Sequence, residues 1–437
     1  MLYYSTNRQV PPVTLREAVI TGLAADHGLF MPGRIGRLDD AFFSQLGQLS
    51  FPEIAFRVAQ LFFGEDIPEE ELRTITAETL SFDCPAVRVT EHIWSLELFH
   101  GPTLAFKDVG ARFMARMLRY FLRGSHKPVT VLVATSGDTG SAVANGFLGV
   151  EGIHVVVLYP SGKVSDIQEK QFTTLGRNIT ALEINGTFDD CQRLVKTAFR
   201  DEHLREKLTL TSANSINVAR FLPQAFYYFN AVARLQEAGA LQGRELVIAV
   251  PSGNFGNLTA GLFAREAGLP VGRFIAANNR NDVVFQYLLS GHYAPRPSVE
   301  TIANAMDVGT PSNFARILDL YGHDWKKIST LMSGFRIDDK EIKETIRRIF
   351  DQTGYLCDPH GACGYAALEA QLEEGETGLF LETAHPAKFT PTMEEILGKG
   401  EVPLPPRLAA FMEGEKNAVK MDSHFPEFRK WLSDNCR

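Results

Sequence analysis

The sequence lacks the features that mark several special classes of protein. It has five cysteines among 437 residues, scattered at positions 84, 191, 357, 363 and 436. An odd, scattered set argues against a disulfide framework and is typical of reduced thiols. No apolar run approaches the roughly 20 residues of a membrane span, and the first ten residues lack the basic and apolar regions of a secretory signal. We therefore expect a cytoplasmic protein with no membrane partner.

The sequence also has no excess of positively charged residues. The formal net charge is -8, which argues against nucleic acid or an anionic membrane as the main partner. Cys357, His360 and Cys363 form a local cluster of metal-binding residue types. A zinc site usually has a tighter cysteine pair and a second pair elsewhere, and the chain has no second pair. We expect no bound metal and no nucleic-acid partner.

The order of apolar and polar segments indicates an α/β protein. The chain is too long for one core, so we expect two or three domains. Residues 1–92 are largely helical in pattern and predict an accessory N-terminal domain. From residue 93, apolar strands alternate with helices, including a long helix over 216–239, which implies parallel sheets covered on both faces. We expect a first α/β domain over 93–240 and a second, with a C-terminal extension, over 241–437.

One lysine stands at a junction of strand, turn and helix. A strand-like run leads into HGPTLAFKD, residues 100–108, and an amphipathic helix follows it. Gly101 and Pro102 break the chain just before this helix, and Lys107 lies beside Phe106 at its start. A lysine gains nothing from the dipole there. It is either a surface lysine or a lysine in an apolar setting whose pKa falls, so that its amine can form a Schiff base.

Three loops follow apolar strands, where open parallel sheets bind their ligands. The first is ATSGDTGSA, residues 134–142. Ser136, Gly137, Asp138 and Thr139 supply hydroxyls and backbone N–H groups just before a helix. Such an arrangement cradles an anion such as a carboxylate. The alternative is an ordinary tight turn between a strand and a helix.

The second loop is PSGNFGN, residues 251–257. Gly253 and Gly256 allow close backbone approach, and Asn254 and Asn257 add donors. A phosphate fits this loop better than a carboxylate, because several N–H groups and a helix dipole converge there. The loop has neither the G-x-G-x-x-G spacing of a dinucleotide site nor the Gly-Lys-Ser/Thr ending of a P-loop.

The third loop is ETAHPAKF, residues 382–389. Thr383 places a hydroxyl at a strand end, where it either closes the strand or hydrogen-bonds a neutral ring nitrogen. A lysine able to form a Schiff base, a phosphate cradle and a hydroxyl for a ring nitrogen are together what pyridoxal 5'-phosphate needs. A nicotinamide cofactor would need no lysine, and it would need the missing fingerprint.

Taken together, HGPTLAFKD, ATSGDTG, SGNFGN and ETAHPAKF resemble the threonine synthase family of fold-type II pyridoxal-phosphate enzymes, within the tryptophan synthase beta-like superfamily. YYSTNRQ, DHGLFMP, SANSINVAR and DPHGA resemble further blocks of that family. The resemblance runs from residue 3 to about residue 390. It departs at His27, where another glycine is expected in the turn. It implies an α/β fold with two open, mostly parallel sheets covered by helices, plus a mainly helical N-terminal domain.

The resemblance also implies a function. The expected reaction converts O-phospho-L-homoserine and water to L-threonine and phosphate by β,γ-elimination and replacement, as a carbon–oxygen lyase acting on phosphates in the last step of threonine biosynthesis. One alternative keeps the fold and the cofactor but yields a 2-oxo acid from O-phosphohomoserine or a hydroxy amino acid. A more remote alternative is a non-catalytic binder of a phosphorylated metabolite. We expect a monomer or a homodimer with a small-molecule substrate.

By the same resemblance, Lys107 is the Schiff-base lysine and shuttles protons, which burial beside Phe106 would favour. The other expected cofactor contacts are Phe106, Gly253, Asn254, Phe255, Gly256, Asn257 and Thr383. The 136–139 loop is expected to bind the substrate carboxylate, and Arg220 suits a phosphate because of its guanidinium geometry. The full set of expected substrate contacts is Ser136, Gly137, Asp138, Thr139, Lys163, Asn214 and Arg220.

Overall fold

The protein is described by a computed structural model that covers residues 1–124 and 128–436. The chain divides into two compact units, each built from segments that are distant in sequence. Unit 1 comprises Met1, Pro32–Phe106 and Phe221–Pro403, and unit 2 comprises Leu2–Met31, Lys107–Arg220 and the chain from Leu404 onward. The sequence predicted three consecutive domains, 1–92, 93–240 and 241–437. The units are grouped differently, and the three-domain division stays a prediction about independently folding parts.

Unit 1 is organised around a six-stranded sheet in the order β12-β11-β10-β13-β5-β4. Five strands are parallel, and β4 runs antiparallel to β5 at the edge. The central strands read as continuous apolar runs because both of their faces are covered. The strands are β4 (Ala86–Arg88), β5 (Ile93–Glu97), β10 (Glu245–Pro251), β11 (Arg273–Asn278), β12 (Met332–Arg336) and β13 (Glu376–Glu382).

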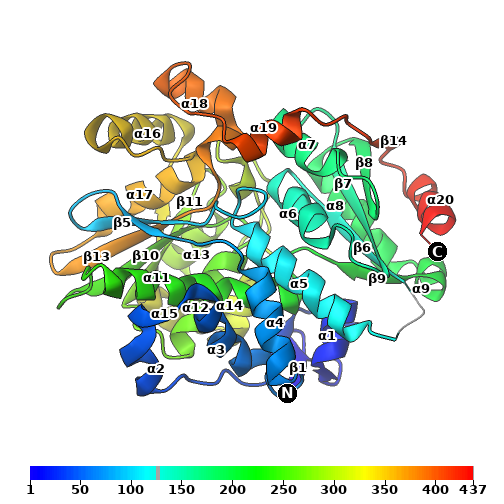
Figure 1. The fold of residues 1–437 in the computed structure, drawn as a ribbon, viewed down its shortest axis with the longest axis horizontal. Helices are drawn as coiled ribbons and strands as arrows, with labels where there is room; N and C mark the ends of the chain where they lie inside the picture. Colours follow the sequence, from blue (N-terminus) through cyan, green and yellow to red (C-terminus); the bar gives the residue numbers. More distant parts are fainter. Residues whose placement is uncertain (125–127, 437) are drawn as a thin grey trace. The chain divides into compact units, whose positions relative to one another are not determined.

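Helices cover this sheet. The helix α17 packs on β10, β11 and β13 (Figure 1). The side chain of Phe274 on β11 contacts Tyr228 of α11 and lies close to Gly261 of α12. The helices of unit 1 are α2 (Asp40–Gln45), α3 (Phe51–Phe63), α4 (Glu69–Thr79), α11 (Ala225–Glu237), α12 (Gly256–Glu266), α13 (Val283–Ser290), α14 (Phe314–Leu320), α15 (Trp325–Leu331), α16 (Asp339–Thr353), α17 (Pro359–Gln371) and α18 (Thr390–Leu397). Its 3-10 turns are η1 (Leu46–Gln48), η2 (Leu222–Gln224), η3 (Asn304–Met306) and η4 (Pro386–Phe389).

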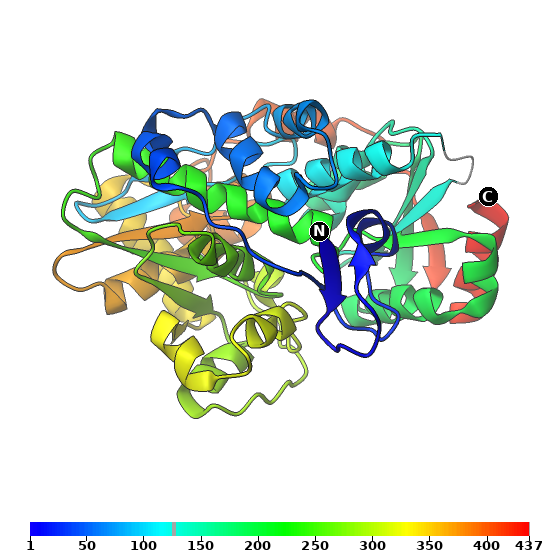
Figure 2. The same ribbon diagram turned by 90° about the horizontal axis from the view of Figure 1, so that it is seen from below.

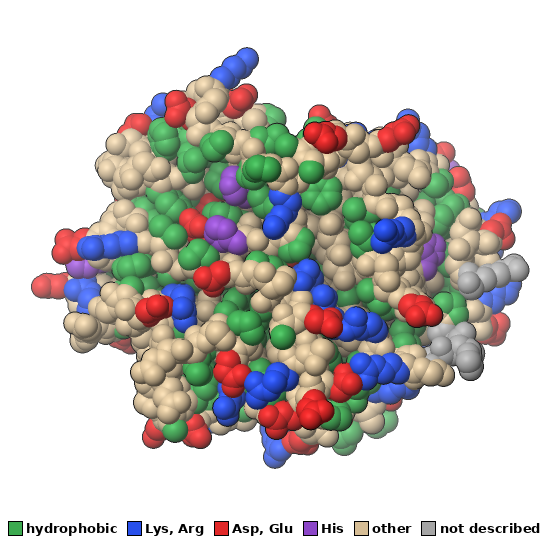
Figure 3. All heavy atoms as spheres, viewed as in Figure 1, with side chains coloured by type: hydrophobic (Ala, Val, Ile, Leu, Met, Phe, Trp, Pro, Cys, Tyr) green, Lys and Arg blue, Asp and Glu red, His purple; other side chains and the backbone are tan. Residues whose placement is uncertain are grey.

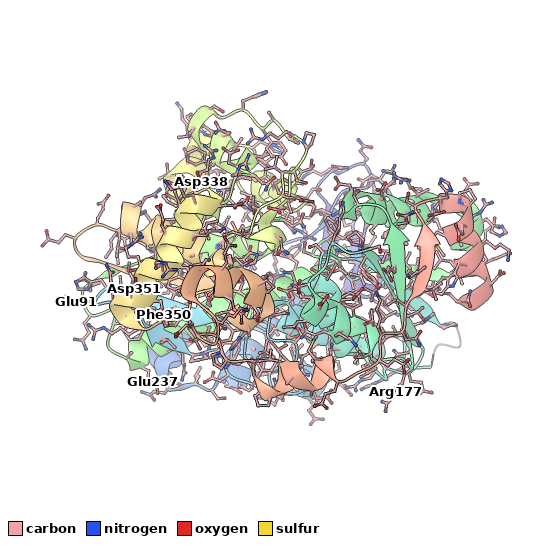
Figure 4. The ribbon with its side chains drawn as sticks, turned by 90° about the horizontal axis from the view of Figure 1, so that it is seen from above. Glu91, Arg177, Glu237, Asp338, Phe350 and Asp351 are labelled. Carbon is pink, nitrogen blue, oxygen red and sulfur yellow. The ribbon has the colours of Figure 1, made fainter. Side chains whose placement is uncertain are left out.

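The outer helix α16 illustrates how local sequence fixes an element. Asp338 accepts from the N–H of Glu341, whose side chain in turn accepts from the N–H of Asp338. This capping box satisfies two amide donors at the start of the helix. Gly354 ends the helix in a left-handed conformation, as is common at helix C-termini. Figure 4 marks Asp338 at the start of α16 and Phe350 and Asp351 near its end.

Unit 2 contains a five-stranded, fully parallel sheet in the order β14-β8-β7-β6-β9. The C-terminal segment supplies its edge strand β14, which lies beside the green elements of this unit in Figure 2. The strands are β6 (Val129–Ala134), β7 (Ile153–Pro160), β8 (Ile179–Asn185), β9 (Thr209–Ser212) and β14 (Val419–Asp422). A separate small sheet has the order β2-β1-β3, formed by β1 (Leu2–Ser5), β2 (Val13–Thr14) and β3 (Phe30–Pro32).

The core of unit 2 joins its sheet to the helices around it. Leu194 of α8 and Phe428 and Leu432 of α20 are fully buried in one cluster with apolar residues of β6, β7 and β8. The helices are α1 (Leu15–Thr21), α5 (Lys107–Phe121), α6 (Asp138–Phe147), α7 (Asp166–Thr173), α8 (Phe188–Arg200), α9 (Glu202–Lys207), α10 (Val218–Phe221), which ends at the first residue of unit 1, α19 (Pro406–Met412) and α20 (Phe425–Asn435).

The fold class predicted from the sequence is confirmed, since both large sheets are mostly parallel and covered by helices. Two details differ. The first 92 residues contain the short strands β1 to β4 among their helices. The long helix expected over 216–239 is broken into α10, η2 and α11, because Pro223 has no N–H to donate and its ring crowds the preceding turn.

The helices and the surface charges match what the sequence composition led us to expect. Within the described residues, no helix is long and apolar enough to cross a membrane. On the face drawn in Figure 3, Lys and Arg side chains are interspersed with Asp and Glu side chains.

The turn at residues 24–28 explains the departure noted at His27. The N–H of His27 donates to the carbonyl of Ala24 at 2.9 Å, and the N–H of Ala24 donates to the carbonyl of Gly28 at 3.2 Å. His27 has a φ of 65° and its side chain is exposed. A left-handed backbone is the reason that glycine suits this position.

We predict that His27→Gly stabilises the protein. The left-handed conformation costs a residue with a Cβ about 1–2 kcal/mol, and the greater freedom of glycine in the unfolded chain offsets about 0.5–1 kcal/mol of that. The free energy of unfolding in urea should rise by about 0.5–1 kcal/mol. The matched variant His27→Ala keeps the Cβ and should gain nothing. Equal stabilities for the two variants would contradict this explanation.

Candidate active site

The segment before Lys107 and the predicted loop at 382–389 lie side by side in unit 1 because the strands that precede them are neighbours. β5 and β13 pair in parallel, and the chain leaves both at the same edge of the sheet. The loops stay paired beyond the strands: the N–H of Phe106 donates to the carbonyl of Thr383 at 2.8 Å, and the N–H of His385 donates to that of Leu104 at 3.1 Å. The residue before Lys107 is therefore fixed against Thr383.

The side chains of Thr383 and Lys107 are largely buried but still partly accessible. The Thr383 side chain is 7% exposed, and its hydroxyl makes no hydrogen bond with any residue that the structure describes. A nearly buried hydroxyl in that state suits a ring nitrogen as its partner. Lys107 is the first residue of α5 and is partly buried.

The loop after β10 has the geometry of an anion site. Phe255 adopts a left-handed conformation, with φ 60° and ψ 17°, directly before α12 begins at Gly256. A left-handed residue followed by a helical one turns successive N–H groups to one side and forms a concavity for anions. No described backbone carbonyl accepts a hydrogen bond from the N–H groups of residues 253–257. This loop therefore offers consecutive amide donors and a helix N-terminus, as a phosphate group requires.

The asparagine side chains of this loop support it internally. Asn257 accepts from the hydroxyl of Ser252 at 2.9 Å and donates to the carbonyl of Pro251 at 2.8 Å. Asn254 accepts from the hydroxyl of Ser312 at 3.2 Å, and its carbonyl accepts from the N–H of Asn313 at 3.1 Å. The sequence suggested that both side chains add donors for a phosphate. The side chain of Asn257 is instead used to hold the loop.

Gly253 is required by close packing behind this loop. A Cβ at this position would lie 2.6 Å from the carbonyl oxygen of Ala305 and 3.0 Å from the Cα of Met306. Contacts below 3.0 Å to backbone atoms cannot be relieved by a side-chain movement, so a larger residue would displace either the loop or the η3 turn. The amide cradle at 253–257 and the hydroxyl at Thr383 together fit a ligand that has a phosphate and a ring nitrogen.

The predicted carboxylate loop in unit 2 is shaped by Thr135. Its hydroxyl accepts from the N–H groups of Gly137 and Gly140 at 2.9 and 2.8 Å and donates to the carbonyl of Gly137 at 3.0 Å. Gly137 has φ 144° and ψ −93°, a conformation open only to glycine. Thr135 thus binds the N–H groups of Gly137 and Gly140, and the other backbone donors of this turn belong to Ser136, Asp138 and Thr139.

Asp138 is held by a residue that the sequence did not point to. Its carboxylate accepts from the side-chain amide of Gln168 at 2.8 Å. Gln168 also lies so close to Gly137 that a Cβ there would be 2.5 Å from its amide carbon. Gln168 is 2% exposed. Its only sequence signal is that it is a polar residue on the buried side of the short helix α7.

Lys163, Asn214 and Arg220 differ in how accessible they are. Lys163 follows β7 and is exposed. Asn214 follows β9 and donates to the carbonyl of Ala134 at 3.3 Å, which brings it to the start of the carboxylate loop. Arg220 is 3% exposed and donates to the carbonyl of Ala213 at 2.6 Å. Since β7, β6 and β9 are adjacent, the segments carrying Lys163, Ser136–Thr139 and Asn214 leave the same edge of the sheet.

Two ionisable residues beside Thr383 are shifted towards their neutral forms. Burial, followed by the positive charges of His100 and Lys388, lowers the pKa of His385 from 6.5 to about 4. Its Nδ1 accepts from the N–H of Ala387 at 3.1 Å. Burial also raises the pKa of Glu382 well above its usual range, and the charge of Asp358 adds to the effect. The strand end at Thr383 is thus flanked by a histidine that is neutral near pH 7 and by a carboxyl group whose pKa is raised.

The metal-binding residue types do not converge. Across residues 1–124 and 128–436, no group of three or more His, Cys, Asp and Glu side chains could hold a metal ion. All five cysteines are buried and free. In the cluster noted from the sequence, Cys357 donates to Glu382 and Cys363 donates to the carbonyl of Pro359.

Comparison with protein families gives matches along most of the chain. Residues 77–383 match the family described as pyridoxal-phosphate dependent enzyme. Residues 2–80 match the family described as threonine synthase N terminus, and residues 361–430 match threonine synthase, C-terminal. These three matches include every segment predicted to carry the site.

Individual proteins are similar over their full length. The chain is 46% identical to the threonine synthase of Serratia marcescens, covering 99% of both chains. The crystal structure of threonine synthase from Escherichia coli superposes with a TM-score of 0.92 at 43% identity, covering 99% of this chain and 100% of that one. The structure of pyridoxal-phosphate-bound threonine synthase from Brucella melitensis gives a TM-score of 0.93 at 34% identity, covering 100% of both.

The shifted pKa of His385 predicts an acid-sensitive contribution to stability. The folded protein holds His385 neutral down to about pH 4, whereas the unfolded chain protonates it near pH 6.5, so this contribution is complete above pH 6.5 and is lost as the pH falls from 6.5 to 4. The loss is at most about 3 kcal/mol, because one pKa unit corresponds to about 1.4 kcal/mol. His385→Asn keeps an acceptor for Ala387, and its unfolding free energy should fall less over this range in urea titrations at each pH.

The exposed His203 provides the control for this prediction. His203→Asn should follow the pH dependence of the unmodified protein. If the curve for His385→Asn also runs parallel to it from pH 7.5 to 4, then the burial of a neutral His385 is not the cause of the acid sensitivity.

Proposed function

Because the chain belongs to the threonine synthase family of pyridoxal-phosphate-dependent enzymes, we propose that it converts O-phospho-L-homoserine and water to L-threonine and phosphate. It is a lyase whose cofactor is pyridoxal 5'-phosphate. The observation that carries the assignment to this chain's own residues is the pairing of Phe106 with Thr383. That pairing fixes the residue before the Lys107 helix beside the nearly buried hydroxyl expected to meet the cofactor ring.

The cofactor residues follow from the unit 1 geometry. The N–H groups of Gly253, Asn254, Phe255, Gly256 and Asn257 would hold the phosphate, supported by the absence of backbone acceptors for them among the described residues. The hydroxyl of Thr383 would hydrogen-bond the ring nitrogen, and Phe106 would flank the ring. When bound, the cofactor supplies an electron sink that stabilises negative charge developing on the substrate carbons. A hydroxyl does not force protonation of the ring nitrogen as a carboxylate would, which suits chemistry at the β and γ carbons.

Lys107 has two roles in this proposal. It would tether the cofactor covalently before the substrate amine takes its place, and its Nζ would then act as the general base and acid. It would accept the α proton and assist removal of a β proton so that the γ-phosphate leaves. A proton must then be delivered to the γ carbon, water adds at the β carbon with loss of one proton, and Lys107 would return a proton to the α carbon. Its position at the first turn of α5 fixes the backbone from which the side chain extends, because the helix is anchored by buried residues.

The substrate residues follow from unit 2. The N–H groups of Ser136, Asp138 and Thr139 and the loop's hydroxyls would bind the substrate carboxylate, with Gly137 giving the turn its shape. Lys163 and Asn214 are the better candidates for the substrate phosphate. Arg220 is a weaker candidate than the sequence suggested, because its guanidinium is buried and bonded to the carbonyl of Ala213. Asp138 would act through the hydrogen bond from Gln168, by holding the loop in place.

The remaining expectations concern the protein's surroundings. The substrate class, a small molecule, follows from the family. A monomer or homodimer and a cytoplasmic location are proposals that size-exclusion chromatography and fractionation test.

Lys107→Ala should abolish threonine formation. Removing the base and tether should lower the rate by at least about 10³-fold, within the range that general acid–base groups contribute. The assay incubates the purified holoprotein with O-phospho-L-homoserine and measures phosphate, threonine and 2-oxobutyrate together. Lys207→Ala removes an exposed lysine at the end of α9 and should leave the rate unchanged.

Each product pattern has a distinct meaning. Equal amounts of threonine and phosphate support the proposal. Phosphate with 2-oxobutyrate in place of threonine identifies a lyase that ends in a 2-oxo acid. A Lys107→Ala variant with a rate within tenfold of the parent rules out the proposed role of Lys107.

Gly253→Ala should weaken the binding of the cofactor without unfolding the protein. The added methyl group would displace the loop from the η3 turn, and a shift approaching 1 Å can cost about 100-fold in a positioned interaction. The dissociation constant of pyridoxal 5'-phosphate, followed by its absorbance, should rise at least about tenfold. Gly36→Ala is the control, since its methyl group would meet only the flexible side chain of Leu61. An unchanged dissociation constant for Gly253→Ala would place the phosphate elsewhere.

A further inference from the structure

The segment CDPHGAC, residues 357–363, has no role in the proposed reaction, yet its polar groups are fully buried. Asp358 and His360 are 0% and 1% exposed, and Glu382, which contacts the segment, is 0% exposed. Burying such groups is costly unless each is hydrogen-bonded. Every one of the three has a defined partner, and together the bonds connect two parts of the proposed cofactor site within unit 1.

The first link leads from Thr383 to Asp358. Glu382 precedes Thr383 at the end of β13, and its Oε1 accepts from the N–H of Asp358 at 2.6 Å. The packing is tight, since a Cβ at Gly361 would lie 1.5 Å from Oε2 of Glu382. The start of α17 is therefore held directly against the strand end that carries the hydroxyl of Thr383.

The second link leads from Asp358 to His360. One oxygen of Asp358 caps α17 by accepting from the N–H of Gly361 at 2.6 Å, and the other lies 2.6 Å from Nδ1 of His360. Nε2 of His360 lies 3.1 Å from the backbone N of Ala305. A backbone N–H can only donate, so Nε2 accepts, and the ring proton is on Nδ1 and is donated to Asp358. The Asp358 carboxylate thus selects the tautomer that can hold Ala305.

The third link leads from Ala305 to the phosphate loop. Ala305 belongs to η3, and its carbonyl oxygen would be 2.6 Å from a Cβ at Gly253. This turn forms the wall against which Gly253 packs, and the position of the loop amides depends on it. The backbone bonds of the turn run from Met306 to Ala303 and from Asp307 to Asn304, so the N–H of Ala305 is held by the ring of His360.

We propose that His360 is a positioning residue for the cofactor phosphate: it holds the η3 turn against Gly253 and, through Asp358 and Glu382, ties that turn to the strand end bearing Thr383. This inference rests on the proposed function, because it takes residues 253–257 as the phosphate site. Burial and the charge of Asp358 raise the pKa of Glu382, which lowers the cost of keeping the two carboxyl groups close together. The role requires an acceptor at the position of Nε2.

Two substitutions at His360 separate this role from general packing. The side chain of His360→Gln is long enough to place an amide oxygen near the position of Nε2, so it can accept from Ala305. The side chain of His360→Asn reaches only the position of Nδ1, so it can bond Asp358 but not Ala305. Each apoprotein is titrated with pyridoxal 5'-phosphate and, separately, with pyridoxal, which lacks the phosphate group.

We expect a loss of affinity only for the ligand that carries the phosphate group. His360→Asn should lower the affinity for pyridoxal 5'-phosphate by about 10–100-fold, the range found when a residue that supports a binding group is removed. Its affinity for pyridoxal should change by less than about twofold. His360→Gln should stay within about threefold of the parent for both ligands. Equal losses for the two ligands, no loss for His360→Asn, or a loss in His360→Gln as large as in His360→Asn would overturn the proposal.

Asp358→Asn tests the same chain of contacts while preserving the fold. Asparagine remains a good helix cap, but its NH₂ group would face Nδ1 of His360 and move the ring proton to Nε2, opposite the N–H of Ala305. The Asp358→Asn variant should show the same selective loss of affinity for pyridoxal 5'-phosphate. An unchanged affinity would count against the proposal. If the parent protein binds no pyridoxal 5'-phosphate, the proposed function fails; if the parent binds it and the variants match it, only the role of His360 fails.

Discussion

The hydrogen bond from the N–H of Phe106 to the carbonyl of Thr383 is the contact on which the unit 1 site depends. Parallel strands deliver their following loops to one edge of a sheet, but the loops then usually separate. Here the loops after β5 and β13 remain paired along the backbone, and Lys388 also donates from Nζ to the carbonyl of Thr103 at 2.9 Å. The position of Phe106, the residue before Lys107, is therefore set relative to Thr383 by main-chain geometry, which is stiffer than any side-chain contact.

A second constraint is the supply of amide donors. A buried N–H without an acceptor is costly in a folded protein, yet the loop at 253–257 keeps its donors away from backbone carbonyls. Side-chain hydrogen bonds hold the loop in place of backbone ones: the Asn257 side chain bonds Ser252 and Pro251, and the Asn254 side chain bonds Ser312. The loop at 134–142 works in the opposite way, since the Thr135 hydroxyl takes up two of its N–H groups, those of Gly137 and Gly140. The two cradles thus differ in how many donors they leave for a ligand.

Local patterns predicted what lies at strand ends, because an apolar strand, a glycine turn and a helix start are all encoded within a few residues. The α/β class, the loops at strand ends and the cofactor were accessible in this way, and the four motifs together indicated the family. Contacts between distant segments were not: Gln168 meets Asp138 across 30 residues, and His360 meets Ala305 across 55. The buried state of Arg220 was hidden for a different reason. Its bond to the carbonyl of Ala213 is local, but its residue type suggested a phosphate partner, and its burial depends on the packing of the whole unit.

Strain at the loops completes the account of how the unit 1 site is held. Leu104 and Phe255 have φ values of 56° and 60°, a conformation that costs a residue with a side chain about 1–2 kcal/mol. Glycine would avoid that cost, but Leu104 and Phe255 are 5% and 2% exposed, and burying such side chains contributes about 1.5–3 kcal/mol each. Burial therefore outweighs the strain and pins the backbone at the two points where it must turn. A glycine would make both turns easier to form and less able to keep the loops in a single position.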